Sequence, residues 1–342
     1  MKIVVLGAGF AGISAKLTYP EAIVIDENDY MISTPRLVEV IERKLPISHA
    51  LLERKVDIKA KVLGVDFKEK VVKTSQGNIK FDKLIIALGY DQDISKIKGA
   101  EKYSMKFSTL EDVQRINNMK EGATVTILGG GSLGIELSGA LVKRGYKVNL
   151  IEAENRLIPY LSQEFSKKAQ SVLEEKGVNI ILKAKVEEVK ENEIITTQGI
   201  IKTDYSIFSA GFSGPKIIKE LGLSNKNGRM LVDKFLTSID FDYVYGAGDC
   251  ANFKEGFIPQ SAQIALQAGE IAIKNALGHE IEFKPNQKAI VLKIADKYLG
   301  EIKGTVINGS IAAIAALIKS FALSSLEGKI RRINLLTNIV VD

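Results

Sequence analysis

The sequence predicts an α/β fold made of two doubly wound parallel-sheet halves and a small α+β segment at the C-terminal end. The chain has 342 residues, 46% hydrophobic and 26% charged side chains, an ordinary globular composition at a length that suggests about two domains. A short β-type run, a glycine-rich turn, a helical stretch and a second β-type run also follow one another twice. A repeated plan of this kind favours a duplicated architecture over one long sheet.

The first copy has its glycine-rich turn at 7–12, a helix over 13–18 and a second strand over 22–26. Asp26 ends that strand, 19 residues after Gly7. This order matches the dinucleotide-binding fingerprint, in which an acid about 20 residues on binds the ribose. The first glycine permits the tight turn, the second lets the backbone approach the pyrophosphate, and the third lets helix and strand pack closely.

The second copy has its turn at 129–134, a helix over 135–144 and the next strand over 147–151. Glu152 ends that strand, 23 residues after Gly129. A lone fingerprint also arises from helix–strand packing, but two copies in register indicate two Rossmann-like dinucleotide sites. The simplest pair of ligands for two such sites is a flavin dinucleotide and a nicotinamide dinucleotide.

Hairpin-like β material follows each copy. We expect strands over 62–67, 71–75 and 83–88 after the first copy, and over 180–183, 186–189, 194–197 and 205–209 after the second.

Composition and charge exclude several classes of protein. One cysteine and two histidines are too few for a disulfide framework, a CxxC redox pair or a Cys/His zinc site, so no metal is expected. The net charge is +6, and residues 283–342 carry nine Lys/Arg against four Asp/Glu. These basic residues lack interleaved aromatic side chains, so no nucleic-acid partner is expected. The N-terminus shows no cleavable signal, and no apolar run reaches the roughly 18 residues that span a bilayer.

Three further segments carry a resemblance to a known family. Residues 81–89 resemble the strand-plus-ATG segment of the two-dinucleotide flavoprotein family of pyridine-nucleotide oxidoreductases, which have the pyridine nucleotide-disulfide oxidoreductase fold. Residues 243–251 resemble its flavin-binding GD motif, and residues 259–267 resemble its helix beneath the flavin ring. The resemblance implies FAD on the first fingerprint and NADH on the second. It also implies an FAD-binding domain over 1–107 and 235–288, an NADH-binding domain over 108–234, and C-terminal strands with an amphipathic helix over 289–342.

Within that family the chain is most similar to the branch of type II NADH:quinone and sulfide:quinone oxidoreductases. Residues 30–40 resemble that branch's loop near the flavin, and residues 262–267 resemble its AQxAxQ quinone-site motif. Sulfide oxidation needs paired cysteines, whereas Cys250 stands alone inside the flavin motif. The resemblance therefore implies an FAD-dependent NADH dehydrogenase with a quinone acceptor. Two alternatives stay open: a soluble NAD(P)H-dependent reductase of oxygen, ferredoxin or rubredoxin, and an NADH-binding flavin redox sensor.

Three side chains are candidates for the reaction itself, namely Glu136, Gln263 and Gln267. Glu136 matches a family position near the nicotinamide, where it binds nicotinamide or relays a proton to quinone, and it also suits the dipole of a helix N-terminus. Gln263 and Gln267 are four residues apart and share a helix face, so they can face a quinone carbonyl, the flavin or solvent. The expected cofactor-binding residues are Gly7, Gly9, Phe10, Ala11, Gly12, Asp26, Glu27, Pro35, Arg36, Ala87, Gly89, Gly129, Gly131, Ser132, Leu133, Gly134, Glu152, Gly211, Gly248, Asp249 and Ala262.

Glu152 favours NADH, because a carboxylate repels the 2′-phosphate of NADPH, and Arg156 could weaken that preference. The C-terminal segment is predicted to contain two strands within 289–303 and an apolar helix over 310–326 with a basic end. Such a helix suits either a membrane interface or a core or dimer interface. The expected location is cytoplasmic, with the alternative of peripheral attachment to the inner face of the cell membrane. A second copy of the chain, in a homodimer, is a further possible partner.

Overall fold

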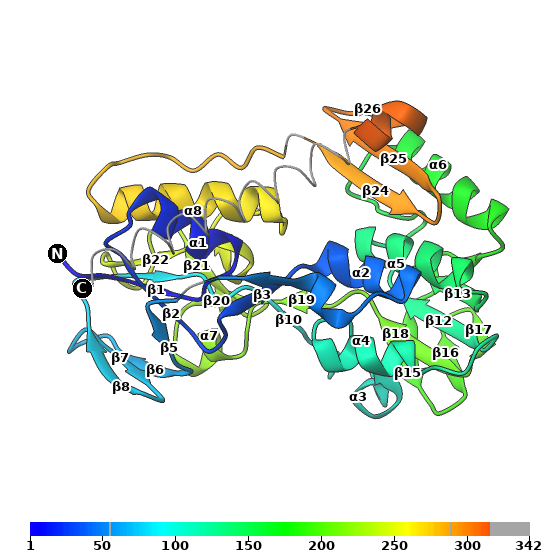
Figure 1. Ribbon diagram of the computed structural model, residues 1–342, viewed down its shortest axis with the longest axis horizontal. Helices are drawn as coiled ribbons and strands as arrows, with labels where there is room; N and C mark the ends of the chain where they lie inside the picture. Colours follow the sequence, from blue (N-terminus) through cyan, green and yellow to red (C-terminus); the bar gives the residue numbers. More distant parts are fainter. Residues whose placement is uncertain (55, 288, 315–342) are drawn as a thin grey trace.

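The computed structural model describes residues 1–54, 56–287 and 289–314, and it has two lobes, each built around a parallel sheet (Figure 1). The first sheet has the strand order β22-β9-β1-β2-β5 and the second the order β11-β18-β12-β13-β14. In chain order the strands of the first sheet are β1 (Ile3–Leu6), β2 (Ile23–Asp26), β5 (Ile58–Lys59), β9 (Lys83–Ile86) and β22 (Val244–Gly246). Those of the second are β11 (Ser104–Met105), β12 (Thr124–Leu128), β13 (Lys147–Ile151), β14 (Asn179–Ile181) and β18 (Tyr205–Phe208).

Each parallel sheet is accompanied by a three-stranded antiparallel meander. The meanders are β6 (Val62–Asp66), β7 (Val71–Thr74) and β8 (Gly77–Lys80) in the first lobe, and β15 (Val186–Val189), β16 (Glu193–Thr196) and β17 (Gly199–Lys202) in the second. The smaller pairings involve β3 (Tyr30–Ile32), β4 (Leu51–Glu53), β10 (Asp91–Gln92), β19 (Phe212–Ser213), β20 (Asn225–Lys226), β21 (Arg229–Val232) and β23 (Ala251–Phe253). The two lobes thus repeat one plan, and the predicted α/β fold class is confirmed.

Helices cover the faces of both sheets (Figure 1). The helices are α1 (Phe10–Thr18), α2 (Thr34–Arg43), α3 (Ala100–Tyr103), α4 (Leu110–Asn117), α5 (Ser132–Lys143), α6 (Gln163–Glu175), α7 (Ile217–Glu220) and α8 (Ala262–Ala276), with 3₁₀ turns η1 (Ile47–Ala50) and η2 (Gly248–Cys250). All four residues of β1 are buried, as expected for a strand covered on both faces. Asp26, the last residue of β2, and Glu152, which follows β13, therefore lie at the carboxyl ends of the parallel strands.

The contact between α1 and α8 is unusually close. A Cβ atom on Gly269 of α8 would lie 2.0 Å from the carbonyl oxygen of Ala11 in α1. The hydroxyl of Ser14 in α1 also donates to the carbonyl oxygen of Leu266 in α8, at 2.7 Å. The two helices therefore meet backbone to backbone, which only glycine at position 269 allows.

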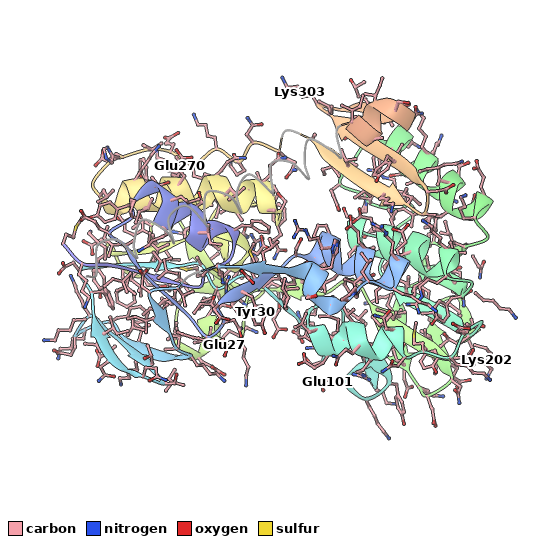
Figure 2. The ribbon with its side chains drawn as sticks, viewed as in Figure 1. Glu27, Tyr30, Glu101, Lys202, Glu270 and Lys303 are labelled. Carbon is pink, nitrogen blue, oxygen red and sulfur yellow. The ribbon has the colours of Figure 1, made fainter. Side chains whose placement is uncertain are left out.

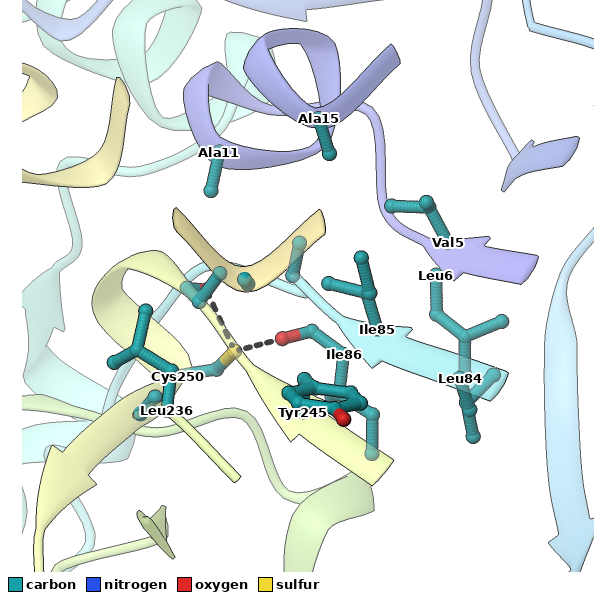
Figure 3. Close-up of a cluster of buried hydrophobic side chains, with 14 of the residues drawn as sticks. Val5, Leu6, Ala11, Ala15, Leu84, Ile85, Ile86, Leu236, Tyr245 and Cys250 are labelled. Carbon is teal, nitrogen blue, oxygen red and sulfur yellow. Dashed lines mark hydrogen bonds between the residues drawn. The ribbon is translucent and has the colours of Figure 1, made fainter. Parts of the chain in front are cut away.

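Cys250 lies in the core of the first lobe (Figure 3). Its thiol donates to the carbonyl oxygens of Ile86 and Ala247, each at 3.3 Å. Burial raises the pKa of this thiol to about 11, so the reactive thiolate form is suppressed at neutral pH. Cys250 is a packed core residue.

Residues 30–40 and the C-terminal sheet differ from the elements expected from the sequence. Residues 30–40 are not a loop, because β3 leads directly into α2. Pro35 lies in the first turn of α2, where its missing N–H does no harm, and Leu37 and Ile41 bury the same helix face. The C-terminal sheet has a third strand, β26 (Thr305–Asn308), beside β24 (Ile290–Ile294) and β25 (Lys297–Ile302).

Residues 309–314 are helical, while the rest of the helix predicted over 310–326 lies outside the described residues. Within the described part of the chain, no helix is long and apolar enough to cross a membrane.

Candidate functional site

The first glycine-rich turn joins β1 to α1 and has the three properties that a dinucleotide turn needs. Gly7 has φ +93°, and a Cβ there would lie 2.4 Å from the carbonyl oxygen of Ala87. A Cβ on Gly12 would lie 1.9 Å from the carbonyl oxygen of Gly7, whereas the Cβ position of Gly9 is open. α1 begins at Phe10, and no side chain of the described residues caps it. The helix thus presents unshielded N–H groups beside an open backbone, the arrangement that binds a phosphate.

Asp26 lies at the end of β2, next to this turn. Its carboxylate accepts from the backbone N–H of Ala8 at 2.8 Å and of Asn28 at 2.9 Å. Arg54 forms an ion pair with it, at 2.9 Å, and also donates to the carbonyl oxygen of Ala8. Glu27, the next residue, is exposed, and Tyr30 opens β3, where the chain leaves the first lobe (Figure 2).

The second glycine-rich turn, between β12 and α5, repeats the geometry of the first. Gly129 has φ +120°, and a Cβ on Gly134 would lie 1.9 Å from its carbonyl oxygen. The Cβ position of Gly131 is open, and within the part of the chain that the structure describes no side chain caps α5. The first turn of α5 contains Ser132, whose hydroxyl is 2.6 Å from that of Tyr160, and the buried Leu133. Two turns of equal geometry in one chain indicate two sites for the same kind of ligand.

Glu152 occupies the place in the second lobe that Asp26 occupies in the first. It accepts from the backbone N–H of Gly130 at 2.7 Å and of Glu154 at 2.8 Å. The guanidinium of Arg156 donates to the carbonyl oxygens of Pro159 and Leu161 and to the hydroxyl of Ser166. These donors of Arg156 are thus engaged within its own loop, and its effect on the preference for NADH stays a prediction.

In each lobe the residues that follow a neighbouring strand lie against the glycine turn. The neighbouring strand is β9 in the first lobe and β18 in the second. Ala87 lies against Gly7, as described above, and Gly89 has φ +72°. In the second lobe the hydroxyl of Ser209 donates to the carbonyl oxygen of Gly129 at 2.8 Å, and Gly211 also has φ +72°. The two lobes thus match in this segment too.

Asp249 provides the buried acceptor of the first lobe. Its Oδ1 atom is buried and has no hydrogen-bond partner among the described residues. The preceding Gly248 has φ +75°, and a Cβ there would lie 3.1 Å from the Cβ of Ala11, so the motif packs against α1. Tyr90 and Asp249 interact electrostatically, and the Tyr90 hydroxyl lies 3.3 Å from that of Thr34 in α2. An orphaned carboxylate oxygen beside an open helix N-terminus fits a flavin dinucleotide, whose ribityl hydroxyls donate and whose pyrophosphate is anionic.

The pKa of Asp249 leads to a pH prediction for the cofactor-free protein. Burial raises this pKa to about 6 from 3.8, although Arg229 lowers it in part. Because the folded state holds the proton more tightly, stability is lost as pH rises from about 4 to about 6. Asp249→Asn should remove that loss. Its free energy of unfolding in urea, relative to wild type, should rise by about 2 kcal/mol between about pH 4.5 and about pH 7.5. A difference that stays constant with pH would contradict the buried carboxylate.

The two amides of the AQxAxQ segment have different surroundings in α8. The side chain of Gln267 donates to the carbonyl oxygen of Asn286 at 2.9 Å and accepts from its N–H at 3.1 Å. This pair ties α8 to the connector that leads to β24. Gln263 lies one turn earlier, and its carbonyl oxygen accepts from the Gln267 amide at 3.1 Å. The geometry gives Gln267 a structural contact, and its catalytic role stays a prediction.

Glu136 lies in the first turns of α5 and faces the C-terminal sheet. Its Oε1 atom accepts from the backbone N–H of Lys293 in β24, at 3.1 Å. Pro35 and Arg36 lie in the first turn of α2, and Ala262 is the first residue of α8, after the capping hydroxyl of Ser261. The predicted site residues thus gather at helix N-termini and at the carboxyl ends of parallel strands, where ligands of such sheets bind.

Sequence reasoning missed two buried arginines beside the candidate acids. Arg54 pairs with Asp26, and Arg229 donates to the backbone oxygens of Asp249 at 2.9 Å and Ile258 at 2.8 Å. Neither arginine belongs to a motif with a fixed spacing, so no local signal pointed to them.

Comparison with known proteins gives a consistent result. The model of the family described as pyridine nucleotide-disulphide oxidoreductase matches residues 1–269. A type II NADH:quinone oxidoreductase of Staphylococcus aureus (strain NCTC 8325 / PS 47) is 27% identical over 326 residues, covering 80% of this chain and 81% of that protein.

Solved structures share the fold. NDH2 from Plasmodium falciparum in complex with NADH has a TM-score of 0.83, 15% identity and 98% coverage of both chains. The sulfide:quinone oxidoreductase of Aquifex aeolicus has a TM-score of 0.80 and 15% identity, covering 96% of this chain and 92% of that one.

Proposed function

This chain belongs to the pyridine nucleotide-disulphide oxidoreductase family, and from that premise we propose that it is an FAD-dependent NADH dehydrogenase that passes two electrons to a quinone. The observation that carries the proposal is the pair of glycine turns, each with an open glycine at an uncapped helix N-terminus and an acid at the end of the next strand. The name of the Staphylococcus aureus relative supports the choice of NADH and quinone.

The first lobe is proposed to hold FAD. The N-terminus of α1 binds the pyrophosphate through its free N–H groups and the positive end of its dipole. Asp26 accepts from the adenosine ribose, and Asp249 Oδ1 accepts from the ribityl chain. A flavin held there would supply the chemistry of hydride acceptance and two-electron transfer to an acceptor. The protein contributes orientation and electrostatics.

The second lobe is proposed to hold NADH. The N-terminus of α5 binds the pyrophosphate beside Gly131, and Glu152 accepts from the adenosine ribose. The carboxylate of Glu152 repels a 2′-phosphate, and the guanidinium of Arg156 is held by its own loop. Both features favour NADH over NADPH.

Glu136 and Gln263 are proposed to act on the nicotinamide and on the acceptor, respectively. Glu136 lies one helical turn into α5, on the helix that binds the pyrophosphate. Gln263 lies in the first turn of α8, which packs against α1. Gln267 is kept as a weaker candidate, because both ends of its amide contact Asn286.

Two measurements on the FAD-loaded protein test this function. Rapid mixing with NADH should bleach the flavin at least as fast as steady-state turnover, and turnover should be faster with short-chain quinones than with oxygen, ferredoxin or rubredoxin. Slow bleaching would leave the redox sensor as the better explanation. Equal turnover with soluble carriers would favour the soluble reductase.

Replacement of one amide separates the two half-reactions. Gln263→Ala should slow flavin reoxidation by quinone about tenfold and leave flavin reduction by NADH unchanged, because the amide is proposed to contact the acceptor and not the nicotinamide. Gln170→Ala, which removes an amide on α6 that bonds Glu174, is the matched control. Equal slowing of both half-reactions would remove Gln263 from the acceptor site.

The proposed location is cytoplasmic, with attachment to the inner face of the cell membrane. Exposed apolar side chains at the C-terminal end of the described chain support a contact there: Ile311 is 64% and Ile314 57% exposed. The same side chains also suit a homodimer interface. Flotation with vesicles of anionic lipid tests the membrane contact, and light scattering in its absence tests the dimer.

A further inference from the structure

Glu42 is a buried carboxylate at the junction of three parts of the molecule. It lies near the end of α2, and only 3% of its side chain is exposed. Lys143, the last residue of α5, approaches it at 2.5 Å, and Lys293 of β24 lies 2.6 Å from its other oxygen. Burial disfavours the charged carboxylate, yet the two ammonium groups bring the pKa of Glu42 below its ordinary value.

Lys293 joins this cluster to Glu136. Its ammonium group is held by both oxygens of Glu42, at 2.9 and 2.6 Å. Its backbone N–H donates to Oε1 of Glu136, at 3.1 Å. One residue of the C-terminal sheet therefore contacts a carboxylate on α2 with its side chain and a carboxylate on α5 with its backbone.

The position of β24 explains why Glu136 receives this N–H. Among the described strands β24 lies at the edge of the sheet order β24-β25-β26, so its outward N–H groups face no described strand of that sheet. A buried or half-buried N–H needs another acceptor, and the Glu136 carboxylate supplies it. A Cβ on Gly139, one turn further along α5, would lie 2.4 Å from the backbone N of Ala295, so the strand lies directly on the helix.

Stability alone is a weak reason for such a cluster. Buried ion pairs contribute little net stability, because the desolvation of the charges offsets their attraction, but they fix geometry when they are complete. Here the ion pairs fix the positions of α2 and α5 relative to β24, the strand whose backbone N–H contacts Glu136.

We propose that Lys293 is a positioning residue for Glu136: its backbone N–H orients the carboxylate, and Glu42 holds Lys293 in place. This proposal rests on the proposed function, in which Glu136 acts on the nicotinamide or on a proton. The C-terminal sheet then helps to hold the proposed active site in place. Through Lys293 it connects α2, on the proposed flavin side, to α5, on the proposed nicotinamide side.

The first test measures the contact itself, without turnover. Hydrogen exchange at the Lys293 amide should become about tenfold faster in Glu136→Ala and in Glu42→Gln than in wild type. It should not change in Lys297→Met, the matched control, which breaks an ion pair between the same sheet and Glu175 of α6. Unchanged exchange in Glu136→Ala would overturn the proposal.

The second test measures the two half-reactions of the FAD-loaded enzyme. Lys293→Met should slow, by about tenfold, the same half-reaction that Glu136→Gln slows, because a small displacement of a positioned group lowers the rate. The double variant should be no slower than Glu136→Gln alone, Lys293→Arg should restore most of the rate, and Lys297→Met should be unchanged.

The outcomes separate this proposal from the proposed function. Additive effects in the double variant, or equal slowing of both half-reactions by Lys293→Met, would overturn the positioning role alone. If Glu136→Gln slows neither half-reaction, the proposed role of Glu136 fails and the positioning role fails with it.

Discussion

Gly131→Asp is expected to prevent reduction of the flavin by NADH at ordinary concentrations while the fold and the FAD content stay intact. The backbone of Gly131, with φ −75° and ψ −174°, suits any residue, and its Cβ position is open. Aspartate is a good N-cap, so α5 should gain a few tenths of a kcal/mol. A carboxylate about 5 Å from a pyrophosphate should repel it by about 3 kcal/mol, which weakens NADH binding roughly 100-fold.

The measurement is the dissociation constant of NADH, with flavin absorbance and thermal unfolding as checks. Gly131→Asn caps the helix without the charge and should weaken binding far less. Gly9→Asp places the same change in the first lobe and should lose FAD instead. Unaltered NADH affinity in Gly131→Asp would mean that the second glycine turn is not the NADH site.

Gly269→Val is expected to be the most destabilising single substitution proposed here, at about 3 kcal/mol or more. Its Cβ would lie 2.0 Å from the carbonyl oxygen of Ala11 and 2.7 Å from the carbonyl carbon. These are backbone atoms, so no side chain can turn away, and α1 and α8 must separate. Because α1 carries the first glycine turn, FAD should be lost as well.

Urea unfolding and flavin content measure this effect. Gly64→Val is the matched control, since the Cβ position of Gly64 in β6 is open and a strand favours valine. Similar stability of the two variants would show that α1 and α8 can move apart at little cost.

The parts of the fold and site that the sequence predicted are those with local signals. The glycine turns were predictable because positive φ at Gly7 and Gly129 and close contact at Gly12 and Gly134 leave no other residue possible. The family match now confirms the resemblance that these motifs carried. The residue roles and the domain boundaries stay predictions.

The contacts that the sequence did not predict are made by pairs of residues that lie far apart in the chain. Lys293 and Glu42 are 251 positions apart, and Arg54 is 46 positions from Ala8, so no spacing rule connects them. Gln267 looked available on a helix face because its partner, Asn286, lies in a connector without a periodic pattern. α2 was missed because residues 30–40 were assigned by their resemblance to a loop near the flavin, although Pro35 is well tolerated in the first turn of a helix.

The strand order of the first lobe has a consequence for synthesis on the ribosome. β9 stays at the edge of its sheet until β22 arrives, and these paired strands are about 160 residues apart. The second sheet is made from one continuous stretch, Ser104 to Phe208, and can form first. The lobe that is translated first is therefore completed last, and its open strand edge needs protection from wrong partners until residue 246 has left the ribosome.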